Sequence, residues 1–332
     1  METRKVQVTG GSTYTVSLPK EWATENGISS GSVVEFQSED NLLLLTPKKE
    51  DDRTEGILDI TGLTEDHELT RAVMTMYVSG FDVITLTTDQ LTASQRRTIR
   101  DASGRLVGLE VIEEMPDKMV LQDLLDSSEL SIENAVTRMR LVALAMLEDG
   151  VEALVTDDDA LANDVIERDD DVDRLWYMTS RVFRTVLRNP TAADDIGYTR
   201  ETCFDLQSSA RQLERIADHA TKIAELSLEV GEVPESAAEP LRELQTEAAR
   251  VPERAMDALL TEDSEQAVEL AGEARDHTGT VEEYARAVDA EIHQFDPQLA
   301  QVLGLVVDSL SRTADYGTNI AESALQKAAP RP

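Results

Sequence analysis

Two pairs of acidic residues, each spaced four residues apart, are the strongest candidates for chemistry in this sequence. The first pair is Asp169 and Asp173, and the second is Glu214 and Asp218. Residues four apart lie one turn above each other on a helix, so each pair presents two carboxylates side by side. Carboxylates brought together away from water repel each other unless they are protonated or bridged by a cation. The two pairs therefore predict a metal site. All-oxygen ligands favour Mg²⁺, Mn²⁺, Ca²⁺ or iron, and Zn²⁺ is less usual with such ligands.

The first pair must be carried by a helix whose apolar face can be read from the sequence. At 100° per residue, Asp169 falls on the apolar stripe and Asp173 lies one turn further along it, so both are predicted to face a helical bundle. Glu167 and Asp171 form another pair on the opposite side, where we expect them to be solvated. The stripe is formed by Val165, Val172, Trp176 and Phe183.

The second pair borders a face of small residues, which lets a neighbouring helix approach closely. These small residues are Ala210, Ala217 and Ala220. One acidic pair in so acidic a chain would most simply be a solvated helix face. Two such pairs on adjacent helices make convergence on a cation the better reading.

Long amphipathic patterns fill residues 128–328 and predict a mainly α fold of six helices arranged in bundles. The predicted helices are 132–154, 160–187, 200–228, 239–260, 264–292 and 298–327. Two smaller regions precede them. Residues 1–50 predict a small β-rich domain, and alternating strand and helix patterns in 51–125 predict a small α/β module of unknown role. The helical domain then spans 126–330.

The run Glu-Arg-Ile-Ala-Asp-His-Ala-Thr-Lys-Ile-Ala-Glu at 214–225, with the paired acidic motifs, resembles the signature of PhoU phosphate-uptake regulators. The resemblance implies two similar three-helix bundles in tandem, at about 128–230 and 235–328. It further implies metal-cluster binding and negative control of phosphate uptake through the phosphate ABC transporter and its sensor kinase.

The second bundle carries an eroded copy of the acidic motifs. Residues 311–322 echo 214–225, and residues 275–281 echo 168–174 more loosely. In this alignment Thr280 and Ser311 replace two of the four acids. We therefore predict a complete metal site in the first bundle and a weaker or absent one around Asp276 and Asp315.

The N-terminal stretch is similar to AbrB, MazE and SpoVT domains in residues 4–11 and 15–22. Such domains are swapped-hairpin dimers, so the resemblance implies a homodimer and possible DNA contact by Arg4, Lys5 and Lys20. Residues 1–50 hold more acidic than basic side chains, which weakens attraction to phosphates. Dimerisation without DNA binding is the alternative.

The composition sets further limits. A net charge of −35, from 66 acidic and 31 basic residues, is typical of halophilic proteins and excludes a large cationic nucleic-acid surface. The single cysteine, Cys203, indicates a reducing compartment and a buried thiol. Because the chain also has no apolar run of membrane-spanning length, we expect a cytoplasmic protein.

Two other classes of protein compete with a metal-binding regulator. Di-iron enzymes on helical bundles need Glu-x-x-His pairs, and none of the four histidines has an acid three residues before it, so no enzyme is expected. The remaining alternative is an AbrB-type transcriptional regulator whose helical body senses metal or phosphate.

Overall fold

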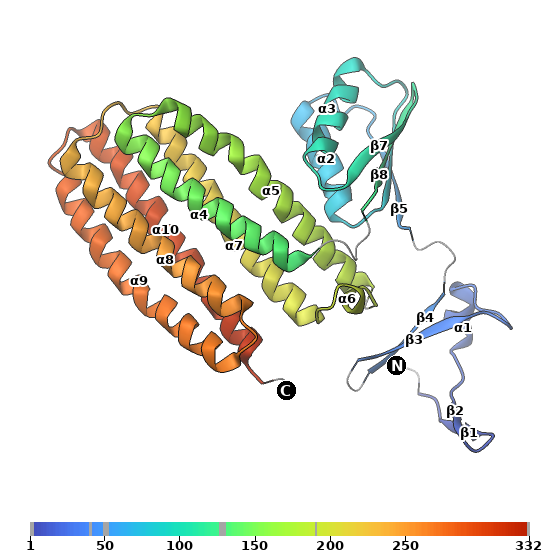
Figure 1. The fold of residues 1–332 in the computed structure, drawn as a ribbon. Coiled ribbons are helices and arrows are strands. Elements are labelled where there is room, and N and C mark those ends of the chain that lie inside the picture. The colour runs from blue at the N-terminus through green and yellow to red at the C-terminus, as the bar shows by residue number, and fades with distance from the viewer. Residues whose placement is uncertain (1–2, 40–41, 49–52, 126–130, 190, 331–332) are drawn as a thin grey trace. The chain divides into compact units, whose positions relative to one another are not determined.

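The structure is a computed structural model that describes residues 3–39, 42–48, 53–125, 131–189 and 191–330. Internal contacts divide the chain into two compact units, Met1–Arg53 and Thr54–Pro332. The predicted fold class, mainly helical with a small strand-rich N-terminal region, is confirmed (Figure 1). None of the helices in the described ranges is long and apolar enough to cross a membrane.

The first unit consists of two antiparallel hairpins separated by a short helix. Gly10 and Gly11 turn the first hairpin with φ of +65° and +81°, values that L side chains rarely adopt. Gly27, with φ of +66°, follows the end of the helix in the left-handed conformation that glycine favours there. The elements are β1 (Gln7–Thr9), β2 (Thr13–Thr15), α1 (Lys20–Glu25), β3 (Val34–Glu39) and β4 (Leu42–Pro47).

The described residues of this unit form no apolar core. Among its described side chains, none is buried. Large apolar side chains are instead exposed on both hairpins, and they include Val8, Tyr14, Phe36, Leu42 and Leu43. A domain of this size normally needs a buried interior or a partner to be stable.

The α/β module begins the second unit and has a mixed four-stranded sheet of order β5-β6-β8-β7. Strands β5 and β6 are parallel, and the other two pairings are antiparallel. In β6, Ile84 and Leu86 are buried against α2 and α3, which lie on one face of the sheet (Figure 1). The elements are β5 (Glu55–Asp59), α2 (Asp66–Val78), β6 (Val83–Thr87), α3 (Ala93–Gly104), β7 (Leu109–Glu114) and β8 (Lys118–Asp123).

The helical body follows, and its long helices lie close to the predicted ranges. They are α4 (Ile132–Thr156), α5 (Asp159–Arg188), α7 (Arg200–Ser227), α8 (Glu235–Leu260), α9 (Ser264–Ile292) and α10 (Pro297–Ala328), with a short α6 (Thr191–Asp195) that the sequence did not predict. Five of them begin at a side chain that accepts hydrogen bonds from the first-turn backbone N–H groups, which stabilises those ends. These caps are Ser131, Asp158, Thr199, Asp263 and Asp296.

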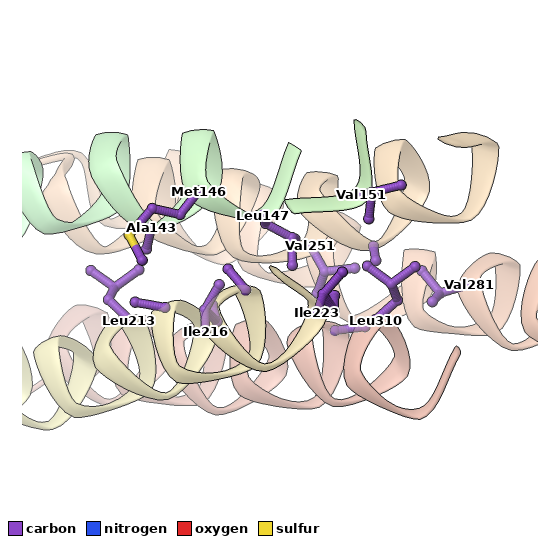
Figure 2. Close-up of a cluster of buried hydrophobic side chains, with 14 of the residues drawn as sticks. Ala143, Met146, Leu147, Val151, Leu213, Ile216, Ile223, Val251, Val281 and Leu310 are labelled. Atoms are coloured by element: carbon purple, nitrogen blue, oxygen red, sulfur yellow. The ribbon is translucent and has the colours of Figure 1, made fainter. Parts of the chain in front are cut away.

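The two bundles share one continuous apolar core instead of having two separate ones. Figure 2 shows Leu147 of α4 and Ile223 of α7 beside Val251 of α8 and Leu310 of α10, all members of one buried cluster. Small residues allow close helix contact within this core. A Cβ at Gly150 would lie 3.1 Å from the backbone oxygen of Ala220, so α4 and α7 approach closely there.

A buried arginine joins the α/β module to α5. Arg181 is 5% exposed, and its Nη1 donates to the backbone oxygens of Tyr77 and Phe81, each at 2.9 Å. Its Nη2 lies 2.7 Å from Asp82 Oδ1, and its Nε lies 2.9 Å from Asp123 Oδ2. All three guanidinium nitrogens thus have acceptors in the module, which makes this a specific attachment.

Candidate metal centre

The four predicted carboxylates come from two neighbouring helices, α5 and α7. Asp169 and Asp173 on α5 are half-buried, and Glu214 on α7 is 8% exposed. Asp218, one turn further along α7, lies at the exposed rim. The predicted contrast with the other acidic pair of α5 is confirmed, since Glu167 and Asp171 are both exposed. The helical phase read from the apolar stripe was therefore right.

The electrostatics show that the four groups act on one another. Burial, followed by the charges of Asp169 and Asp218, raises the pKa of Asp173 to about 6. Burial and the charge of Asp218 raise the pKa of Glu214 to about 7. The pKa of Asp169 is raised by burial and by Asp218. Asp169, Asp173 and Glu214 are thus harder to ionise than in water, first because they are buried and second because their neighbours are acids.

Two side chains that sequence reasoning did not single out complete the cluster. Arg211 donates from Nη1 to Glu214 Oε1 at 2.5 Å. Thr221 lies near enough to Asp169 to lower its pKa, but its buried Oγ1 makes no hydrogen bond within the described chain. Both lie on α7, at −3 and +7 from Glu214. The helical period that aligned the acids also places these positions near the same face, and that signal could have found them.

Burial leaves one carboxylate oxygen of the cluster without a hydrogen-bond partner in the described chain. Within the described chain, Glu214 Oε2 is buried and accepts no hydrogen bond. A buried carboxylate oxygen in this state is costly unless a cation or a proton satisfies it. The oxygen-only ligand set and this unpaired atom fit a hard metal ion.

The cluster is not arranged as a finished coordination sphere. In the described residues, no three His, Cys, Asp or Glu side chains lie close enough together to hold one ion as they stand. The positions of Asp169, Asp173, Glu214 and Asp218 therefore do not by themselves form a metal site.

The second bundle, where the sequence predicts a weaker metal site or none, differs from the first. Asp276 of α9 is exposed, and Asp315 of α10 is exposed and lies 3.4 Å from Arg312. The structure brings these two acids into no shared cluster within the described residues. Hydroxyls take this place between the helices, because Thr278 Oγ1 and Thr318 Oγ1 lie 3.1 Å apart.

The register of the repeat explains the difference. The buried residues Ala162, Val165 and Val172 of α5 have the same spacing as Ala271, Ala274 and Val281 of α9. In this alignment the residue equivalent to Asp169 is Thr278 and not Asp276. The sequence comparison had matched Arg168-Asp169 with Arg275-Asp276, whereas the apolar spacing aligns the buried residues of the two helices.

The remaining sequence candidates lie outside this cluster. Arg4 and Lys5 precede β1 and Lys20 begins α1, and all three are exposed in the first unit. Cys203 is a buried free thiol, as predicted. Burial raises its pKa to about 11, so it is a poor nucleophile.

Fold and site together define a class of protein: tandem helical bundles with pairs of carboxylates on adjoining helices. Comparison with known proteins identifies the family that this class resembles. Residues 136–227 match the family model described as the PhoU domain, and residues 7–53 match the one described as antidote-toxin recognition MazE, bacterial antitoxin. Both resemblances inferred from the sequence are confirmed.

Individual relatives support the same assignment for the helical body. A protein of Pseudomonas aeruginosa named phosphate-specific transport system accessory protein PhoU homolog is 27% identical over 211 residues, covering 59% of this chain and 84% of its own. A protein of the same name from Pseudomonas putida is 26% identical over 211 residues, 59% of this chain and 79% of its own. The crystal structure of PhoU from Pseudomonas aeruginosa superimposes with a TM-score of 0.50 at 25% identity, over 58% of this chain and 93% of the other.

Proposed function

We propose that this chain regulates phosphate transport and that its first bundle binds a divalent or iron ion through Asp169, Asp173, Glu214 and Asp218. The PhoU domain match spans all four residues, and the relatives carry the name of phosphate-transport accessory proteins. The mutual electrostatic influence of four carboxylates around a buried, unpaired oxygen carries the proposal. A bound ion would supply the positive charge that lets these groups remain ionised side by side.

Elemental analysis of the purified protein tests the site. We expect the variant Asp169→Ala, Glu214→Ala to lose bound metal, because it removes one ligand from each helix. The matched control is Glu167→Ala, Asp171→Ala, which removes the same charge from exposed positions and should retain the metal. Equal metal content in the two variants would mean that the ligands are misassigned.

The regulatory part of the proposal is negative control of the phosphate ABC transporter, its sensor kinase, or both. Cells lacking this protein should take up more phosphate than wild-type cells when phosphate is plentiful. The wild-type gene should restore control, and the Asp169→Ala, Glu214→Ala gene should not. Full restoration by that variant would separate regulation from the metal site.

We further propose that the first unit is a dimerisation domain. Its lack of buried side chains among the described residues, and its exposed apolar residues on both hairpins, favour a second copy of the same unit as the partner. Burial of these side chains against the copy would supply the apolar interior that the single unit lacks.

Sedimentation of the full chain tests this dimer. Leu43→Glu should shift the protein toward monomer, because it places a charge among apolar side chains of the interface. Leu141→Glu is the control, since Leu141 of α4 is 65% exposed against 64% for Leu43. A dimer that survives Leu43→Glu would contradict the proposal.

A gel shift abolished by changing Arg4, Lys5 and Lys20 would favour the alternative of DNA binding by this unit.

A further inference from the structure

Arg211 contacts residues of both helices that carry the carboxylates. It belongs to α7, and its Nη1 lies 2.5 Å from Glu214 Oε1 on the same helix. Its Cζ lies 5.2 Å from the centre of the Trp176 ring on α5. The guanidinium is thus held at two points, by a charged hydrogen bond and by an aromatic face.

The charge of Arg211 acts on three of the four carboxylates and not on Glu214 alone. It lowers the pKa of Asp173, Glu214 and Asp218, and for Asp218 it is the largest opposing influence. Arg215, one turn away, has a weaker effect on Glu214 and Asp218, and its guanidinium lies over the Tyr316 ring of α10. Of these two arginines, Arg211 is therefore the one placed as a counter-ion of the cluster.

The two carboxylate oxygens of Glu214 have different surroundings. Its Oε1 is neutralised by Arg211, whereas its buried Oε2 has no partner in the described chain. A guanidinium bonded to only one oxygen leaves the other available to a competing cation. Arg211 is therefore a partner of Glu214 that a metal ion can replace.

We propose that Arg211 is an internal counter-ion that holds Glu214 while no metal is bound and competes with the metal for this ligand. The inference rests on the proposed metal site and adds its regulation. The Arg211 side chain is 41% exposed, so the guanidinium can turn toward water when it leaves Glu214. Competition of this kind weakens metal binding and sets the cation concentration at which the site fills.

Calorimetric titration of the full, chelator-treated protein with Mn²⁺ tests this competition. Arg211→Gln should bind Mn²⁺ roughly tenfold more tightly than wild type, because metal binding no longer breaks a charged hydrogen bond. Arg215→Gln is the matched control, since it removes the same charge from the same helix without touching Glu214. It should change the dissociation constant by less than about threefold, as expected for a charge without direct contact.

The outcomes separate this inference from the proposed function. Damage to the fold would weaken Mn²⁺ binding, so a tighter Kd in Arg211→Gln is not a structural artefact. Unchanged or weaker binding in that variant, or equal tightening in both variants, overturns the role of Arg211 and leaves the metal site standing. Absence of Mn²⁺ binding in wild type and both variants overturns the metal site itself. Binding by Arg211→Gln alone supports the inference, because it means that Arg211 prevents Mn²⁺ binding completely in the wild type.

Discussion

Replacing Arg181 by methionine is expected to detach the α/β module from the helical body. Methionine is also unbranched, but it removes the four interactions that Arg181 makes with Asp82, Asp123 and two backbone oxygens. Removing one partner of a buried charged network costs about 3–5 kcal/mol. We expect a loss of this size in the stability of the attached module. Urea unfolding and hydrogen exchange in α2 would measure it.

A control between the module and α5 separates this effect from charge removal in general. Arg105 of the module lies 3.5 Å from Asp170 of α5, and both side chains are more than half exposed. An exposed pair contributes about 0–1 kcal/mol, so Arg105→Met should barely change stability. Similar losses in both variants would show that net charge, and not the buried network, holds the module.

The pH dependence provides a second check on Arg181. Burial raises the pKa of Asp123, and Arg181 opposes this rise. Without Arg181 the pKa of Asp123 should rise further, so protonation relieves the unpaired charge in the variant at a higher pH than in wild type. The stability difference between Arg181→Met and wild type should therefore shrink as the pH falls from about 8 to about 5.

The helical body could be predicted from sequence because its apolar spacing is long and nearly uninterrupted. The predicted helix 239–260 begins four residues earlier, at Glu235, and it contains Pro240 and Pro252. The short α6 was missed because Asn189 and Pro190 signal only an ending. Local signals place long helices well and single-turn helices poorly, since tertiary packing decides the latter.

The candidate site was predicted in part, for a related reason. Helical spacing located the acids on facing sides of α5 and α7 and separated them from the solvated pair. Arg211 was overlooked because acid spacing alone does not show which cation neutralises a cluster. The alignment of Asp276 with Asp169 differs from the one that the buried residues give, because it matched charged residues, which packing constrains less than buried apolar ones.

Gly317→Ala is expected to destabilise the second bundle. A Cβ at this position would lie 2.5 Å from the backbone nitrogen of Pro252 and 2.8 Å from its Cδ. Neither atom can move without shifting α8, so the added methyl must push α8 and α10 apart. Overpacking of this kind costs about 3 kcal/mol, toward the upper end of its usual range. The free energy of unfolding in urea measures the loss.

Two other glycines allow the stability changes of three Gly→Ala variants to be ranked. Gly279 lies inside α9, and among the described residues nothing lies within 4 Å of an added Cβ. Gly279→Ala should therefore stabilise the protein by about 1 kcal/mol, through helix propensity alone. Gly150→Ala should fall between the two variants, because its nearest backbone atom is 3.1 Å away. A loss for Gly317→Ala no greater than that for Gly150→Ala would mean that α8 and α10 can separate easily. The shared core that joins the two bundles would then be softer in the second bundle than the contact at Pro252 implies.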